Sequence, residues 1–177
     1  MPKLPKLAWI IIIGSLSLLF VLVAIALLFG GGSRTSSSPY VESLSYAQEI
    51  ARVSESVKQM SQDPNVQGLA STTSSVLLSN DTELTSYLKN SGIEVDPKSL
   101  ASKEDKEVDA QLQEASQSNR LPEAYARYLS LYLEDYQTSL QAAYDQAGQE
   151  GKKLINEAHE SVEIILSTPA IKEVRGS

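Results

Sequence analysis

The pattern of apolar and polar positions divides the chain into one uninterrupted apolar run and a series of amphipathic segments. Residues 7–29 form the apolar run and contain no charged side chain. As an α-helix with a rise of 1.5 Å per residue, this run is about 35 Å long, which is enough to cross the roughly 30 Å hydrocarbon layer of a bilayer. We therefore expect a single transmembrane helix over residues 7–29, in contact with lipid.

The charges around the apolar run indicate its orientation. Lys3 and Lys6 precede it, whereas Arg34 is the basic residue that closely follows it. Because positively charged flanks stay in the cytoplasm, residues 1–6 are expected to be cytoplasmic and the remainder of the chain extracytoplasmic. A cleaved secretory signal is the alternative, since an Ala-x-Ala sequence occurs at 24–26. The apolar region of such signals is typically only about 7 to 15 residues long, so the longer run favours an uncleaved signal anchor.

A Gly/Ser-rich stretch, residues 30–39, follows the apolar run and is typical of a flexible linker. Beyond the linker, apolar residues recur at intervals of three and four, which is the period of an amphipathic helix. The first such segment covers residues 40–60. Its predicted apolar face consists of Tyr46, Ile50, Val53, Val57 and Met60.

A second helix is expected to begin at Asp63, which serves as its N-cap, with Pro64 at the first helical position. Gly92 suits the left-handed residue that follows a helix. Asn80 and Glu83 also match a capping box, which would interrupt the helix at that point. We favour the continuous helix, which forms a hairpin with the first.

The polar stretch 93–120 predicts a crossover connection with a short helix over 103–115. Pro122 then opens a third long helix. Its apolar positions fall within an arc of about 100°, and they are Tyr125, Leu129, Tyr132, Tyr136, Leu140, Ala143 and Ala147.

The stretch Gly148 to Gly151 is expected to turn the chain into a fourth long helix, which Pro169 ends. Its predicted buried face consists of Ile155, Ala158, Val162 and Ile165. Residues 169–177 are expected to form a C-terminal tail.

Together these segments predict an all-α fold, with an antiparallel four-helix bundle over residues 40–168. No segment of this region alternates between apolar and polar residues with the period of two that strands require. Two helical hairpins joined by a crossover that contains a short helix are the architecture of ferritin-like bundles.

Composition narrows the classes of function. The chain has no cysteine, which excludes disulfides and thiolate metal sites. Residues 35–177 carry 12 of the 15 basic side chains and all 22 acidic ones, a net charge of −10. An acidic domain of this kind repels phosphate backbones, so we expect no nucleic-acid partner.

Tyrosines spaced three and four residues apart on the third long helix are the candidates for a site. Tyr125, Tyr132 and Tyr136 lie within the predicted apolar arc and Tyr128 lies at its edge. Tyrosine rings at such positions pack in the core, or line a ligand cavity or a protein interface where their hydroxyls find partners. The candidate cavity or interface residues are Tyr125, Tyr128, Tyr132, Asp135, Tyr136 and His159.

Two stretches of the bundle region, DPNVQGLASTTSSVLLSNDTELTSYLKNSGI (63–93) and YLEDYQTSLQAAYDQA (132–147), resemble a known family. They are similar to the bacterial domain-of-unknown-function family numbered 4142, a ferritin-like envelope domain. That family has an Asp/Asn-Pro-x-Val helix start, an Asp-His pair within each of two helices, and Gly-Ile after the second. The resemblance covers about residues 40–168 and implies a ferritin-like bundle in a bacterial cell envelope.

The match to this family is partial. Residues 63–66 match its helix start, Gly92 begins its Gly-Ile, and Asp135 matches the acid of its later Asp-His pair. Tyr136 stands in place of the later histidine, and Leu77 lies close to where the earlier histidine would fall. A histidine-dependent role therefore does not carry over to this chain.

A ferritin-like di-iron centre needs two Glu-x-x-His motifs. The chain has one histidine, His159, and the nearest preceding glutamate, Glu157, is two residues away rather than three. A site made of carboxylates alone is the alternative, because Glu42, Glu49 and Glu83 lie at the flanks of their apolar stripes, but none of them lies at the centre of a stripe. We therefore expect no metal and no cofactor.

These patterns predict a membrane-anchored, extracytoplasmic module without catalytic activity, which has a structural role or binds another protein of the bacterial envelope. The alternative is a ferritin-like receptor or enzyme that binds a ligand or metal in a tyrosine-lined cavity of the bundle.

Overall fold

The structure is a computed structural model that describes residues 38–176. The expected transmembrane helix over 7–29 and almost all of the expected linker lie outside the described residues. No helix within 38–176 combines the length and the hydropathy required to span a bilayer. In this part of the chain all regular structure is helical, in the order α2 (Pro39–Met60), α3 (Pro64–Asn90), α4 (Pro97–Leu100), the 3₁₀-helix η1 (Ala101–Lys103), α5 (Lys106–Gln117), α6 (Leu121–Tyr144), α7 (Gln149–Leu166) and α8 (Pro169–Arg175).

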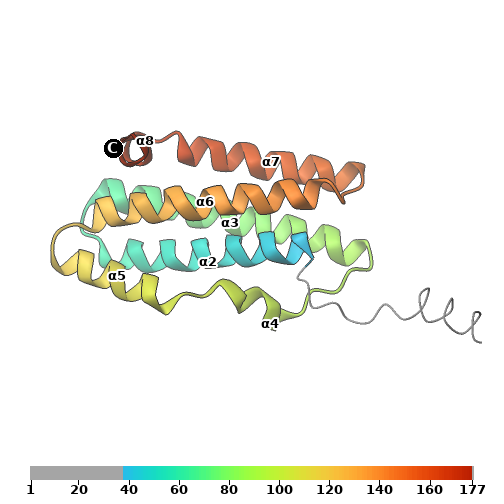
Figure 1. Cartoon of the computed structure of the whole chain (residues 1–177), viewed down its shortest axis with the longest axis horizontal. Coiled ribbons are helices and arrows are strands. Elements are labelled where there is room, and N and C mark those ends of the chain that lie inside the picture. The colour runs from blue at the N-terminus through green and yellow to red at the C-terminus, as the bar shows by residue number, and fades with distance from the viewer. Residues whose placement is uncertain (1–37, 177) are drawn as a thin grey trace, which may run out of the picture. The chain divides into compact units, whose positions relative to one another are not determined.

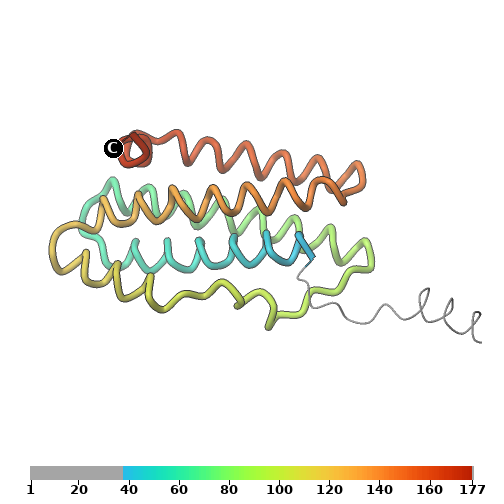
Figure 2. The backbone as a smooth tube through the Cα atoms, viewed as in Figure 1, coloured from blue at the N-terminus to red at the C-terminus, as the bar shows by residue number. Residues whose placement is uncertain are grey.

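The four long helices lie side by side as two hairpins, α2 with α3 and α6 with α7 (Figure 1). Between the hairpins the chain returns along α2 through α4, η1 and α5, as the tube in Figure 2 shows. The predicted all-α bundle is confirmed for the described residues, and so is a helical crossover between the second and third long helices.

The start and the end of α3 follow from its sequence. Asp63 caps the helix, because its Oδ1 accepts a hydrogen bond of 2.8 Å from the backbone N–H of Asn65, and Pro64 occupies the first turn. The helix continues without a break to Asn90, so the alternative start at Asn80 is wrong. Gly92 has the predicted left-handed conformation, with φ of 75°.

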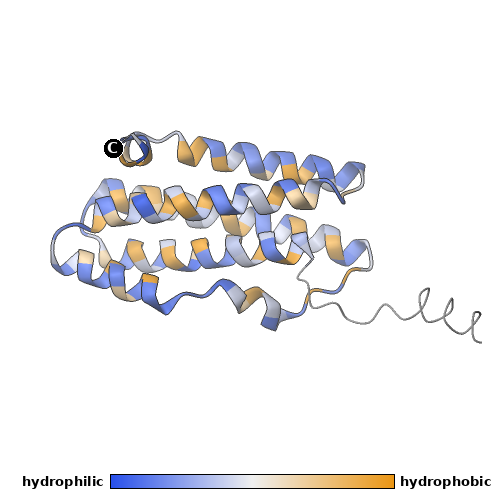
Figure 3. Ribbon diagram, in the orientation of Figure 1, coloured by the Kyte–Doolittle hydropathy of each residue, from blue (hydrophilic) through white to orange (hydrophobic). Residues whose placement is uncertain are grey.

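The apolar residues of all four long helices meet in one core, and Figure 3 shows them recurring along each helix between hydrophilic positions. The predicted face of α7 is confirmed, since its four residues are all buried. The largest fully buried side chains are Tyr125, Tyr136, Leu44, Ile50, Leu77, Leu88, Leu129, Leu133, Leu140 and Ile171.

Helix α2 is buried on more sides than its sequence period predicts. Ser45 is buried because α4, η1 and α5 cover the side that would otherwise meet water, and its hydroxyl also lies 3.0 Å from the carbonyl oxygen of Ser99. Ser43 and Ser54 are buried on the apolar face itself, where Ser54 meets Tyr125 of α6. The hydroxyls of Ser43, Ser45 and Ser54 each donate to the carbonyl four residues earlier, at 2.9, 2.7 and 2.6 Å respectively. The small side chain of Ser45, whose hydroxyl is satisfied within the helix, therefore lets the crossover lie close to α2.

The crossover helix starts later than expected. The predicted helix over 103–115 is observed as α5, which begins at Lys106 because Asp105 takes the N-cap position. The Asp105 carboxylate accepts a hydrogen bond of 2.8 Å from the N–H of Glu107. The short elements α4 and η1, which the sequence analysis did not predict, precede it.

The C-terminal residues form a helix and not the expected tail. Pro169 does follow the end of α7, but it also occupies the first turn of α8. Ile171 on α8 is fully buried, and α8 packs against α6. The packed domain therefore continues beyond residue 168.

Only part of the predicted Gly148–Gly151 turn is a turn. Gly148 is the N-cap of α7, whereas Gly151 lies inside the helix and is buried. A Cβ atom at position 151 would lie 2.7 Å from Cζ of Tyr87. Glycine is therefore favoured at this position by the close approach of the Tyr87 ring of α3 and not by a turn.

Candidate functional site

Three of the six predicted site residues come together, as a row of rings along α6. The ring centroids of Tyr125 and Tyr128 are 6.4 Å apart, and those of Tyr128 and Tyr132 are 4.4 Å apart. Tyr46 of α2 extends the row, with its centroid 6.5 Å from that of Tyr132. Residues three and four apart on a helix share a face, which is why the sequence spacing produces this row.

The burial along the row differs from the expected order. Tyr128, expected at the edge of the apolar arc, is only 6 % exposed, whereas Tyr132, expected inside the arc, is half-buried. The reason is that α6 packs against α5 as well as α2, so the flank that carries Tyr128 lies inside the bundle.

Tyr125 occupies the deepest position of the row and has a hydrogen-bond partner there. Its hydroxyl donates to Oγ of Ser54 at 2.8 Å, and Ser54 in turn donates to the carbonyl of Ile50. Burial raises the pKa of Tyr125 to about 12. The side chain therefore remains neutral at physiological pH.

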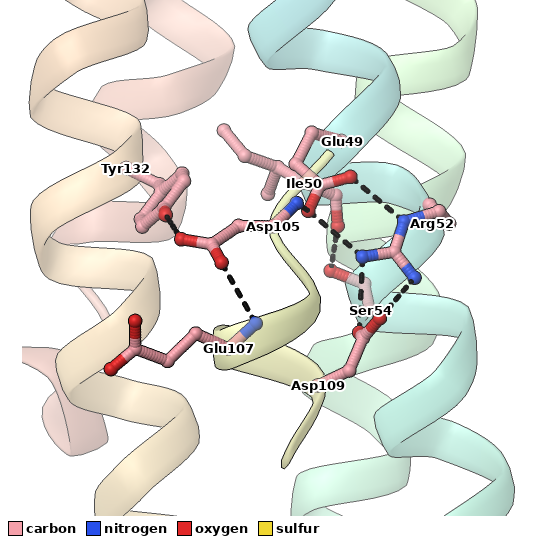
Figure 4. Close-up of polar contacts among 8 residues, drawn as sticks. All are labelled: Glu49, Ile50, Arg52, Ser54, Asp105, Glu107, Asp109 and Tyr132. Atoms are coloured by element: carbon pink, nitrogen blue, oxygen red, sulfur yellow. Dashed lines mark hydrogen bonds and ion pairs between the residues drawn. The ribbon is translucent and has the colours of Figure 1, made fainter. Parts of the chain in front are cut away.

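A buried carboxylate lies beside the row. Glu49 of α2 is 2 % exposed and accepts two hydrogen bonds of 2.8 Å from the guanidinium of Arg52. It accepts a third, of 3.1 Å, from the backbone N–H of Asp105 (Figure 4). Hydrogen bonds to Glu49 raise the pKa of Arg52 above its usual value. A buried carboxylate is stable only when it is paired and hydrogen-bonded in this way.

Arg52 joins this buried pair to the crossover. Its guanidinium also donates to both carboxylate oxygens of Asp109 on α5, at 3.0 and 3.1 Å. Close by, the hydroxyl of Tyr132 donates to Asp105 at 3.4 Å, as Figure 4 shows. These contacts tie α2, α5 and α6 together at one point.

A second ion pair joins the start of the crossover to α2. Nζ of Lys103 lies 3.1 Å from Oε1 of Glu42 and donates to the hydroxyl of Tyr46 at 3.0 Å. The same nitrogen lies 4.1 Å from the centroid of the Tyr46 ring. Lys103 therefore interacts with the carboxylate of Glu42 and with the ring of Tyr46, both on α2.

The hydroxyl of Tyr128 differs from its neighbours in the row. It is buried and has no hydrogen-bond partner among the described residues. Burial, and next the charge of Glu49, raise the pKa of Tyr128 far above its usual range. A phenol in this environment stays protonated and does not act as a base.

The other three predicted residues do not join this cluster. Tyr136 is 1 % exposed, and burial, and then the charge of Asp81 on α3, raise its pKa. Asp135 is exposed. His159 is half-buried on α7, with Nδ1 3.7 Å from Oε1 of Glu163. The predicted site is therefore not one constellation.

Glu49 and Arg52 are the central residues that the sequence analysis missed. Glu49 was placed at the flank of an apolar stripe and not in the core. A signal was present in the sequence, because Ser45 lies one turn before Glu49 on the same flank of α2 and its small side chain leaves room for a covering segment.

The charged residues around the tyrosine row form ion pairs with one another, Arg52 with Glu49 and Asp109, and Lys103 with Glu42. No group of three or more His, Cys, Asp or Glu side chains within residues 38–176 is arranged to hold a metal ion. No protein-family model, curated protein or solved structure matches the chain. The similarity to the domain of unknown function numbered 4142 therefore stays a prediction.

Proposed function

We propose that this chain is a membrane-anchored, extracytoplasmic module of a bacterial cell envelope, which binds another protein or has a structural role and has no catalytic activity. In this proposal residues 7–29 are the transmembrane helix, residues 1–6 are cytoplasmic, and the described domain is a ferritin-like bundle outside the cytoplasm.

The observation that carries the proposal is that the buried and half-buried charges of the bundle form ion pairs with one another. Arg52 donates hydrogen bonds both to Glu49 of its own helix and to Asp109 of α5, and Lys103 binds Glu42. These charges hold the crossover onto the bundle. Such a network supports a rigid scaffold, and the 23-residue apolar run at 7–29 supports its attachment to a membrane.

The absence of cysteine from the sequence makes a direct test of topology available. Single variants Lys3→Cys and Ser75→Cys place one thiol before the apolar run and one on the exposed surface of α3. Intact cells are treated with a membrane-impermeant maleimide. Labelling of Ser75→Cys without labelling of Lys3→Cys is expected, and the reverse pattern would overturn the proposal.

Binding of a protein partner is tested separately by crosslinking in intact cells. The expected result is a defined crosslinked species that contains this chain and one other envelope protein. Recovery of the chain only in uncrosslinked form, at crosslinker doses that capture known membrane neighbours, would count against the interaction role.

The alternative, a ligand-binding receptor or enzyme, has one observation in its favour. The hydroxyl of Tyr128 is buried without a partner, as a group awaiting a ligand would be. Against this alternative, the rings of Tyr125, Tyr128 and Tyr132 pack on one another and fill the space between the helices. Native mass spectrometry of the chain from its own host distinguishes the two, because a retained small molecule or metal would favour the alternative.

A further inference from the structure

A groove opens where the first turns of α3 and α6 meet the junction of α7 and α8. Its volume is about 560 Å³. The lining is mainly apolar and includes Val66, Leu69, Ile164, Ile165 and Pro169. We call this feature the distal groove. Its volume lies within the range of about 300 to 1,000 Å³ that is typical of ligand pockets.

The distal groove lies at the end of the bundle farthest from the entry of the chain. Helix α2 begins at Pro39 and ends at Met60, and Asp63, which lines the groove, follows three residues later. A helix of this length extends over about 33 Å. The groove is therefore at the opposite end of α2 from Pro39, where the segment that includes the proposed anchor joins the bundle.

Two features keep the apolar wall of the groove open. Ile164 is 70 % exposed, more than any other large apolar side chain in the described part of the chain, although Ile165 beside it is in the core. Gly68 contributes no side chain, and a Cβ atom at this position would have no neighbour within 4 Å. Exposed apolar surface that adjoins a groove is typical of a binding site.

The charges around the distal groove indicate what would bind in it. Asp63 is the charged residue of the lining. Glu160 and Glu163, exposed acids one turn before Ile164 and next to it on α7, lie outside the lining. Glu163 has His159 within 3.7 Å, which is uncharged unless protonated. Helix α3 forms the other wall of the groove, and residues 64–80 of this helix contain no charged side chain.

The remaining charges nearby largely cancel. Glu123 and Arg127 on α6 form an ion pair of 3.4 Å, and Arg175 of α8 pairs with Glu134 of α6. Helix α8 also carries Lys172 and Glu173. The surface is therefore acidic on the α7 side and apolar in the groove. A second copy of this chain, with its own excess of acidic residues, and an anionic lipid surface would both bring like charge to the acidic α7 side, which favours a cationic partner.

We propose that the distal groove binds a cationic amphipathic helix of another envelope protein. The helix inserts two or three apolar side chains, spaced at three and four residues, between Leu69 and Ile164, and its lysine or arginine residues face Asp63, Glu160 and Glu163. This inference rests on the proposed function as an interaction module, and it adds the site and the chemistry of the partner.

The test uses the full-length chain in phosphatidylcholine nanodiscs and two synthetic 18-residue helical peptides, one of leucine and lysine and one of leucine and glutamate. Binding of the dye-labelled peptides is measured by fluorescence anisotropy, with empty nanodiscs as the blank. The variant Ile164→Asn removes the apolar rim. The matched control is Leu131→Asn, because Leu131 is 57 % exposed on α6 and does not line the groove.

The leucine–lysine peptide is expected to bind, and Ile164→Asn is expected to weaken its binding at least tenfold while Leu131→Asn changes it less than twofold. The leucine–glutamate peptide is expected not to bind. Equal losses in the two variants, or equal binding of the two peptides, would overturn the proposal. The proposal would also be overturned if analytical ultracentrifugation showed a wild-type dimer that Ile164→Asn dissociates, because the occupant would then be a second copy. A lipid that the wild-type chain retains and Ile164→Asn loses would likewise identify another occupant.

Failure of this inference and failure of the proposed function give different results. If Ile164→Asn forms the cellular crosslink in the same yield as the wild-type chain, the interaction role stands and the groove is not its site. If the maleimide labels Lys3→Cys in intact cells and not Ser75→Cys, the proposed location is wrong, whereas the peptide titration still decides whether the groove binds a cationic helix.

Discussion

Arg52 of α2 and Asp109 of α5 are 57 positions apart in the chain and are joined by hydrogen bonds of 3.0 and 3.1 Å. The same guanidinium holds the carboxylate of Glu49, which is 2 % exposed. A single side chain therefore neutralises a buried charge and fastens the crossover to the bundle.

The first prediction is that Arg52→Met lowers the free energy of unfolding by about 1.5 to 3 kcal/mol, because it removes the charged hydrogen-bond donor of the buried Glu49 carboxylate, although the Arg52 side chain itself is 37 % exposed. Replacing both partners, Glu49→Met with Arg52→Met, is expected to recover most of this loss, since two packed apolar side chains substitute well for a buried ion pair. Chemical denaturation followed by circular dichroism measures both. A double variant as unstable as the single one would contradict this account.

The control for Arg52 is Lys58→Met in the same helix. Lys58 pairs with Glu55 at 3.2 Å, but both side chains are more than 40 % exposed. Exposed ion pairs contribute about 0 to 1 kcal/mol, so this variant is expected to remain close to the wild-type stability.

The contrast between these two ion pairs shows what helix period can predict. The spacing of apolar residues identified one face of α2 correctly, because the core residues Ile50, Val53 and Val57 are all buried. It placed Glu49 at the flank of that face, since the period of a helix does not reveal a second segment that covers its other side. The crossover supplies that cover, and its helix starts from the N-cap Asp105.

Local sequence signals predicted the boundaries of α3 correctly, but they did not predict which residues are buried by contacts between helices. Asp63 and Gly92 bound α3 as predicted, because capping and left-handed geometry depend on neighbouring residues alone. Gly151 and Ile171 were misread, since each is buried by a helix distant in sequence, Gly151 by Tyr87 of α3 and Ile171 within the shared core. For the same reason Tyr125, Tyr128 and Tyr132 form a row along α6 as their spacing predicts, whereas Asp135, which is exposed, and His159 of α7 do not join it.

The second prediction concerns Gly151, which a ring of α3 approaches closely. In Gly151→Ala the new Cβ would lie 2.7 Å from the Tyr87 ring, which itself packs against Tyr40 at 6.4 Å. Overpacking of this kind typically costs about 1 to 3 kcal/mol, which outweighs the gain of up to about 1 kcal/mol from replacing a helical glycine. A lower midpoint of thermal unfolding is the expected result.

Gly68→Ala is the matched control for Gly151→Ala. Gly68 also lies inside a helix, but a Cβ atom there has open space around it. Only the gain in helix propensity remains, so this variant is expected to be more stable than wild type by up to about 1 kcal/mol. If both alanine variants raise the midpoint of thermal unfolding, the close contact between position 151 and Tyr87 does not destabilise Gly151→Ala, and the prediction is wrong.

The third prediction compares two neighbouring tyrosine hydroxyls of α6. Tyr128→Phe removes a buried hydroxyl that has no partner among the described residues, so it is expected to raise the free energy of unfolding by about 1 kcal/mol. Tyr125→Phe removes the hydrogen bond of 2.8 Å to Ser54 and is expected to lower it by about 1 kcal/mol. Urea denaturation of the two variants under identical conditions tests the sign of each change. A loss of stability in Tyr128→Phe would show that its hydroxyl has a partner in solution.

The fourth prediction is that stability decreases at alkaline pH because of the buried tyrosines. Burial raises the pKa of Tyr125 to about 12 and raises those of Tyr128 and Tyr136 as well, whereas tyrosine in an unfolded chain titrates near pH 10. Above pH 10 the unfolded state therefore releases protons that the folded state retains, and each such tyrosine lowers the free energy of unfolding by about 1.4 kcal/mol per pH unit. Below pH 10 this contribution to stability is fully present. Denaturant titrations at pH 8, 10 and 11 measure the slope of the free energy of unfolding against pH. Tyr125→Phe is expected to reduce this slope by the contribution of one proton. An unchanged slope in that variant would contradict the raised pKa of Tyr125.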